Sequence, residues 1–153
     1  MNLNWTYKSF DEFTIHELYE VIALRLEVFS VEQNCPYQDL DGKDQKSGHL
    51  MGYADNGDLA AYARILPQGV SYKEVSIGRI VTSPQYRSIG LGKALMQKIF
   101  AQIEGQFGQV AIRISAQCYL DRFYRSLDFV PVGESYLEDN IPHIEMLRIY
   151  AEA

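Results

Sequence analysis

The chain has 153 residues, a length that is typical of one domain with a single hydrophobic core. Hydrophobic residues make up 47% of the sequence and charged residues 22%, as in ordinary soluble proteins. The net charge of −6 argues against nucleic acid as a partner, because contacts to phosphates need clustered lysines and arginines.

Hydropathy and cysteine spacing limit where in the cell the protein is expected and whether it binds a metal. No apolar run is long enough to span a bilayer, and the first residues lack a secretory pattern, so we expect a cytoplasmic protein without a membrane partner. Cys35 and Cys118 have no metal-ligand spacing. We therefore expect two reduced thiols and no metal site.

The first elements are a strand over residues 5–10 and a helix behind it. Thr14 and Glu17 have the spacing of a capping box, and Phe13 and Leu18 that of a hydrophobic staple, so the helix is expected to begin after Thr14. The predicted apolar face of this helix consists of Ile15, Leu18, Tyr19, Ile22, Leu26 and Phe29.

Three strands follow a polar, turn-rich segment over residues 33–47. Residues 49–54 and 59–66 flank Asn56 and Gly57, a pair that favours a β-hairpin. Residues 75–82 form a third apolar run and predict another strand.

The second half of the chain alternates helices with strands. Helices are predicted at residues 94–103 and 119–127, and strands at 109–115 and 144–150. The order is β-α-β-β-β-α-β-α-β, with an optional further strand at the end, and many α/β folds share it.

The turn between the 75–82 strand and the next helix is suited to an anion. Gly90 and Gly92 allow backbone N–H groups to approach a ligand closely. The positive end of the helix dipole favours a negative charge at the same place. The segment from Arg87 to Lys93 is therefore a candidate phosphate cradle.

Three phosphate-binding patterns were compared at this turn. A Walker A loop fails at Arg87 and Ala94, which stand where it has glycine and Ser/Thr. A dinucleotide fingerprint fails at Leu95, in place of its third glycine. The pattern R/Q-x-x-G-x-G/A is matched by Arg87, Gly90 and Gly92. An ordinary strand-to-helix turn stays open as an explanation.

The third pattern resembles the pyrophosphate loop of the GNAT (Gcn5-related N-acetyltransferase) family, as does Pro84-x-x-Arg87 before it. The resemblance implies an α/β fold in one domain over residues 1–153, with a central twisted mixed sheet of about seven strands flanked by helices. It also implies acetyl-CoA as co-substrate. The residues implied to bind it are Ile80, Val81, Thr82, Arg87, Ser88, Ile89, Gly90, Leu91, Gly92 and Lys93.

A second match lies at residues 123–129, which resemble the F-Y-x-x-x-G-F segment of the family, with Asp128 in the glycine position. The resemblance implies that Tyr124 lies near the cofactor sulfur and acts as the general acid for the leaving thiolate. Taken alone, Tyr124 is equally a core aromatic on an amphipathic helix. Asp tolerates a positive φ, so a helix end at Asp128 stays possible.

Three further segments resemble ElaA-like members of the family. They are residues 25–37 (R-x-x-V-F-x-V-E-Q-x-C-P-Y), 116–120 (A-Q-x-Y-L) and 138–143 (E-D-G-I-P-H). Asn140 stands in the glycine position of the last one, and Asn is a common residue at positive φ. This resemblance does not supply the acceptor.

Transfer to an amine needs a polarised carbonyl, a neutral amine and a proton for the thiolate. The backbone N–H of Val81 is the expected oxyanion donor. His143 titrates in the right range for the base, and Glu32, Glu138 and Asp139 are the alternatives. Each of these side chains also has a structural explanation in a turn, a cap or an ion pair. The candidate substrate-binding residues are Arg25, Phe29, Glu32, Glu138 and Asp139.

Two other functions stay open. Residues 25–29, with Asp39, Asp41 and Asp44, resemble acyl-homoserine-lactone synthases, which are longer and use an acyl carrier. A non-catalytic acetyl-CoA sensor or partner module is the second alternative. The acceptor could be a small amine, a peptide terminus or a lysine, and a homodimer is the default assembly.

Overall fold

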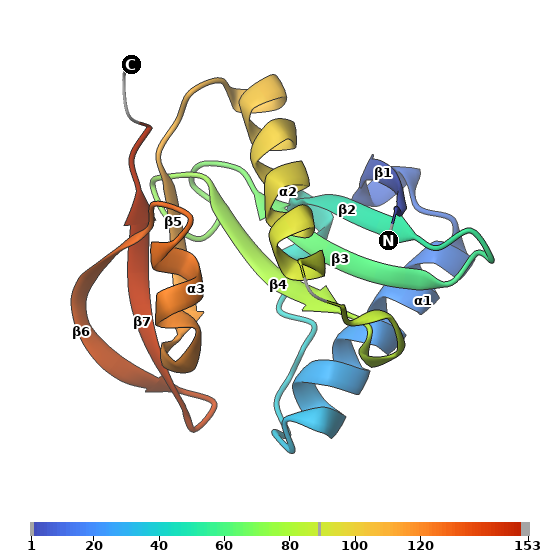
Figure 1. The fold of residues 1–153 in the computed structure, drawn as a ribbon, viewed down its shortest axis with the longest axis horizontal. Coiled ribbons are helices and arrows are strands. Elements are labelled where there is room, and N and C mark those ends of the chain that lie inside the picture. Colours follow the sequence, from blue (N-terminus) through green and yellow to red (C-terminus); the bar gives the residue numbers. More distant parts are fainter. Residues whose placement is uncertain (1, 89, 151–153) are drawn as a thin grey trace.

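The computed structural model describes residues 2–88 and 90–150, which form two antiparallel sheets and three α-helices (Figure 1). The first sheet has the order β1-β2-β3-β4, and the second has the order β5-β7-β6. The strands are β1 Asn4–Ser9, β2 Gly48–Tyr53, β3 Leu59–Leu66, β4 Ser76–Thr82, β5 Ile112–Gln117, β6 Val130–Glu138 and β7 Ile141–Arg148. The helices are α1 Ile15–Leu26, which continues as a π-helical turn over Glu27–Glu32, α2 Leu91–Phe107 and α3 Asp121–Arg125.

The number of strands agrees with the expected sheet of about seven, but the strands do not form one continuous mixed sheet. Among the described residues, the backbones of the two sheets are joined by a parallel bridge between Val75 and Ile112, where the N–H of Arg113 donates to the carbonyl of Val75 over 2.9 Å. Beyond this bridge β4 and β5 diverge (Figure 1). A β-bulge in β4 contributes, because a bulge bends its strand and increases the local twist.

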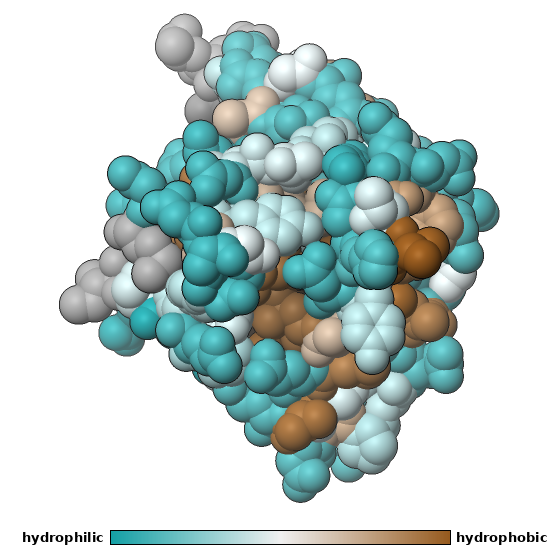
Figure 2. All heavy atoms as spheres, turned by 90° about the vertical axis from the view of Figure 1, so that its right-hand side faces the viewer, coloured by the Kyte–Doolittle hydropathy of each residue, from teal (hydrophilic) through white to brown (hydrophobic). Residues whose placement is uncertain are grey.

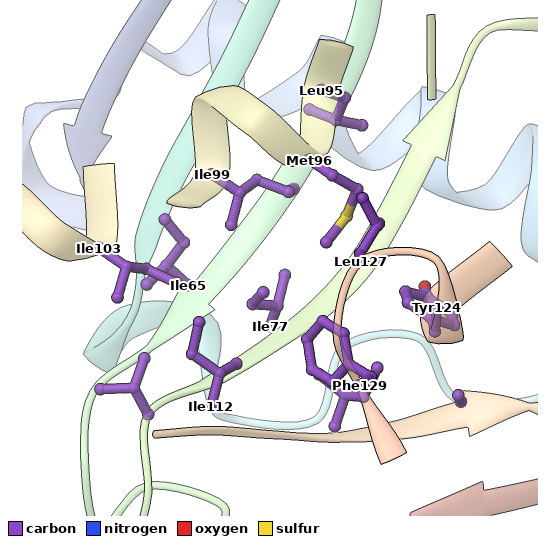
Figure 3. Close-up of a cluster of buried hydrophobic side chains, with 14 of the residues drawn as sticks. Ile65, Ile77, Leu95, Met96, Ile99, Ile103, Ile112, Tyr124, Leu127 and Phe129 are labelled. Carbon is purple, nitrogen blue, oxygen red and sulfur yellow. The ribbon is translucent and has the colours of Figure 1, made fainter. Parts of the chain in front are cut away.

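The first sheet is covered on both faces, which explains its nearly uniform burial. Ala61, Ala63 and Ile65 of β3 pack in one cluster with α2, and Tyr62 packs in a second cluster with α1. The first cluster extends to the second sheet and α3, as Figure 3 shows. Its labelled members are Ile65, Ile77, Leu95, Met96, Ile99, Ile103, Ile112, Tyr124, Leu127 and Phe129.

The predicted start of α1 is confirmed, and its predicted apolar face is wrong in part, although Phe29 does pack against the buried cluster. The N–H of Glu17 donates to the Thr14 hydroxyl (3.1 Å), and the N–H of Thr14 donates to the Glu17 carboxylate (2.9 Å). Ile15 and Tyr19, however, are 80% and 78% exposed. The helix carries apolar residues on more than one side, and contact with the sheet selects a different set: Val21, Leu24 and Val28, with Arg25 beside them.

Figure 2 shows one face of the molecule, which is mostly hydrophilic. Apolar residues appear there in a central recess and in smaller patches toward its right-hand side and lower end. None of the described helices is long and apolar enough to cross a membrane.

Other elements differ from prediction mainly at their ends. The hairpin at Asn56 and Gly57 is confirmed, with Gly57 at φ 93°. α2 is longer than the predicted 94–103, and β5 begins three residues later than predicted. No bounds were predicted for β6, because Pro131 and Gly133 are disfavoured in strands and mask the pattern.

Buried ion pairs hold the segment between α1 and β2 against the sheet. The Arg25 guanidinium lies 2.8 Å from an Asp44 oxygen and 2.9 Å from an Asp39 oxygen. Arg64 of β3 lies 3.0 Å from Asp44, and Arg79 of β4 lies 2.9 Å from Asp39. Because unpaired buried charges are costly, these carboxylates bind the segment to both strands.

His49 of β2 makes stability depend on pH. Its Nε2–H donates to the carbonyl of Asp44 (2.9 Å), and its Nδ1 accepts from the Tyr62 hydroxyl (2.7 Å). Burial lowers the pKa of His49 below that of an unfolded histidine, so the neutral ring favours folding above about pH 6.5 and this stability is lost as pH falls. We expect the free energy of unfolding in urea to fall by up to about 2 kcal/mol from this group between pH 7.5 and 5.

The measurement is made on matched variants. His49→Asn should flatten this pH dependence, whereas His16→Asn, at an exposed helix position, should keep it. An equal pH dependence in the wild type and His49→Asn would contradict the assignment.

Candidate active site

A cleft of about 400 Å³ opens where β4 and β5 diverge. Its walls come from the C-terminal half of β4, from β5, from the π-helical turn after α1, from α3 and from the β6–β7 turn. Segments far apart in the sequence therefore meet in one cavity.

The bulge in β4 leaves one edge of this strand open to the cleft. Ladder pairing shifts between Gly78 and Val81, and Arg79 adopts φ 52°. The N–H of Ser83 donates to the carbonyl of Ala60 (2.8 Å), so by alternation the backbone groups of Val81 point toward β3 as well. Those of Ile80 and Thr82 point the opposite way, toward β5 and the cleft. The N–H of Val81 is therefore poorly placed as an oxyanion donor.

The predicted cradle forms the turn from β4 into α2. Gly90 caps the helix at φ 89°, a conformation that favours glycine, and the space around its missing Cβ is open. The N–H groups of Gly92 and Lys93 belong to the first helical turn, which has no carbonyl partners within the helix. Ser88 before this cap does not have a positive φ, so its backbone is unstrained. Ile89 lies outside the described residues.

Arg87 contacts Glu32 at the end of the π-helical turn. Its two terminal nitrogens donate to the two carboxylate oxygens over 2.9 and 2.7 Å. Both side chains are partly exposed, at 43% and 40%. The hydrogen bonds from Arg87 lower the pKa of Glu32, which keeps the carboxylate ionised.

Tyr124 lies between the core and the cleft. Its ring packs edge-on against Phe123 and Phe129, and only 6% of the residue is exposed (Figure 3). Within residues 2–88 and 90–150 no hydrogen-bond partner meets its hydroxyl, and burial raises the pKa of this group. Asp128 adopts φ 71°, which confirms that aspartate serves the left-handed turn after α3.

The β6–β7 turn brings His143 and two carboxylates to the cleft. The Nδ1–H of His143 donates to the carbonyl of Ile141 (2.7 Å), so the neutral ring presents an unprotonated Nε2. This Nε2 lies 3.3 Å from a carboxylate oxygen of Glu138. Asn140 has a positive φ, as the Asn-for-Gly replacement predicts, and so does Asp139 before it. The thiol of Cys35 donates to the carbonyl of Asp139 (3.2 Å) and joins this turn to the opposite wall.

Most of the site residues predicted from the sequence lie in the cleft or in the turn beside it, and Arg25 does not. The cleft is lined by Phe29, Glu32, Ile80, Val81, Thr82, Arg87, Tyr124, Glu138, Asp139 and His143. Ser88, Gly90, Leu91, Gly92 and Lys93 form the adjoining turn and helix start rather than the cleft wall. The expectation that Arg25 binds substrate is wrong, because its guanidinium is 1% exposed and paired with Asp39 and Asp44.

Two further residues, Arg79 and Tyr37, line the cleft wall, and sequence reasoning missed Tyr37. Arg79 lies against the Tyr37 ring, 5.5 Å from its centroid, while it pairs with Asp39. Gln33 and Gln117 exchange side-chain hydrogen bonds across the cleft. A charged residue within an otherwise apolar strand was the available signal for the bulge at Arg79.

Comparison with known proteins agrees with this geometry. Residues 15–149 match the model of the acetyltransferase (GNAT) domain family. The chain belongs to the GNAT family. Its family membership makes it an acyltransferase. The expected fold and the ElaA-like resemblance are confirmed.

The similar GNAT proteins cover nearly the whole chain. ElaA of Escherichia coli is 39% identical over 153 residues, which is 99% of both chains. The crystal structure of E. coli ElaA superimposes with a TM-score of 0.87 at 38% identity, over 95% of this chain and 99% of that one. An acyl-CoA N-acyltransferase from Pseudomonas aeruginosa superimposes with a TM-score of 0.91 at 44% identity, over 96% and 99%.

Proposed function

We propose that this protein transfers the acetyl group of acetyl-CoA to an amine by direct attack in a ternary complex. The observation that carries the proposal is the meeting of Tyr124 and His143 in one cleft that begins beside a phosphate cradle. Tyr124 is suited to give a proton and His143 to take one, as acyl transfer between a thioester and an amine requires.

The residues present fit acetyl-CoA. The N–H groups of Gly92 and Lys93, the α2 dipole and the Arg87 guanidinium would hold the diphosphate. The exposed backbone edge at Ile80 and Thr82 would pair with the pantetheine amides and polarise the thioester carbonyl. When bound, acetyl-CoA supplies the activated acyl group.

His143 and Tyr124 would complete the proton balance. The amine nitrogen bonds to the acetyl carbon and the carbon–sulfur bond breaks. Nε2 of His143 takes the proton that the attacking nitrogen loses. The protonated ring then has an acceptor at each nitrogen, because Ile141 faces Nδ1 and Glu138 faces Nε2. The buried Tyr124 hydroxyl donates its proton toward the leaving sulfur.

Calorimetric titration with acetyl-CoA, ATP and NADH tests the cofactor assignment. We expect binding of acetyl-CoA alone, and at least about 100-fold weaker binding to Gly92→Glu, because a carboxylate would lie in the diphosphate cradle. Among the described residues, a Cβ on Gly92 would meet the Phe123 ring at an ordinary 3.7 Å, so the cradle has room there for a side chain.

Gly105→Glu is the matched control. It places the same side chain in open space near the other end of α2 and should leave binding unchanged. Binding of ATP or NADH in place of acetyl-CoA, or an unchanged affinity in Gly92→Glu, would contradict the proposed function.

A further inference from the structure

The Arg87–Glu32 ion pair uses a group that acetyl-CoA would need. Both terminal nitrogens of Arg87 are committed to the two oxygens of Glu32, at 2.9 and 2.7 Å. Glu32 grips the end of the guanidinium through these two nitrogens, which is the bidentate geometry that a phosphate group also uses. The two terminal nitrogens cannot bind the Glu32 carboxylate and a diphosphate bidentately at once, so the two anions compete for them.

Both partners are placed to separate. The two side chains are partly exposed, and ion pairs of this kind contribute little to stability. Arg87 follows β4 and precedes α2, whereas Glu32 ends the turn after α1. Breaking the pair therefore leaves both elements in place and frees one carboxylate inside the cleft.

On the assumption that the proposed function holds, we propose that Glu32 competes with the cofactor diphosphate for Arg87, and that the released carboxylate then binds a second positive charge on the acceptor. The acceptor is thus an amine that carries a further cationic group. Cofactor binding and acceptor binding are coupled through this exchange of partners.

The charges on the cleft wall support a cationic acceptor. Among the described lining residues the two arginines are Arg79 and Arg87, and Arg79 is held by Asp39 at 2.9 Å. Glu138 and Asp139 face the cleft from the β6–β7 turn. Once Arg87 turns to a diphosphate, the freed Glu32 adds a further carboxylate to this acidic wall.

A separate observation indicates where the acceptor reacts. Tyr124 lines the cleft, and only 6% of the residue is exposed. Among the described side chains its hydroxyl has no hydrogen-bond partner. This hydroxyl is therefore available to a polar atom of a ligand in the cleft, as donor or as acceptor. The reacting nitrogen would lie near Tyr124 and the second charge toward Glu32.

The first experiment measures the affinity of coenzyme A by calorimetry. Glu32→Gln removes the competing charge and should tighten binding by about two- to fivefold. Glu27→Gln makes the same charge change in the same turn, outside the cleft, and should leave the affinity unchanged. In an Arg87→Gln background, Glu32→Gln should no longer produce this gain.

The second experiment measures the coupling with two amine probes of equal length. 1,5-Diaminopentane should bind coenzyme A-loaded wild type at least about threefold more tightly than the free protein, and 1-aminopentane should not. The difference between the probes should vanish in Glu32→Gln. Equal binding of the two amines, or no binding of the diamine, would overturn the acceptor assignment.

The outcomes separate this inference from the proposed function. If wild type binds no acetyl-CoA, the proposed function fails. If wild type binds acetyl-CoA but Glu32→Gln binds coenzyme A with equal or weaker affinity, the exchange at Arg87 alone is overturned.

Discussion

Tyr124→Phe is expected to lower kcat by about 10²–10⁴-fold while the affinity for acetyl-CoA changes by less than about twofold. The substitution removes only a hydroxyl that has no partner among the described residues, and it keeps the ring that packs against Phe123 and Phe129. The core should therefore stay intact while the leaving thiolate loses its proton donor. Steady-state assays of thiol release, together with calorimetry, measure both quantities.

The control is Tyr19→Phe, the same change at an exposed position of α1 outside the cleft, which should leave kcat unchanged. A Tyr124→Phe enzyme with unaltered kcat would show that another group or water protonates the thiolate. A wild type that binds acetyl-CoA and acetylates no amine would favour the non-catalytic sensor instead.

Arg25→Met is expected to destabilise the fold by about 3–5 kcal/mol. Arg25 is fully enclosed, and its removal leaves the carboxylates of Asp39 and Asp44 buried with fewer positive partners. The Asp44 carboxyl has a pKa below its usual range: burial opposes ionisation, but the hydrogen bond and the charge of Arg25 outweigh it. Urea unfolding followed by circular dichroism at pH 7.5 measures the loss.

Arg125→Met serves as the comparison, because Arg125 makes an exposed pair with Asp121 one turn away and its loss should cost about 0.3–0.5 kcal/mol. A similar small loss for Arg25→Met would mean that the segment relaxes and hydrates Asp39 and Asp44. The rank order of the two variants is thus a direct test of how closed the network is.

Short-range features of this protein were predictable from its sequence. The capping box at Thr14, the hairpin at Gly57 and the positive φ of Asp128 and Asn140 all follow from residues a few positions apart. The glycine pattern after Arg87 likewise predicted a helix start suited to a phosphate. Backbone hydrogen bonding and steric limits act over such distances, so the local sequence determines them.

The tertiary structure decided the features that depend on distant partners. Which face of α1 is buried, whether Arg25 meets a substrate or Asp44, and how β4 bulges at Arg79 depend on contacts with other elements. The contact between Arg87 and Glu32 joins residues 55 positions apart. Burial and ion pairing act through space, and neither helix periodicity nor loop composition determines which of several possible partners a side chain meets.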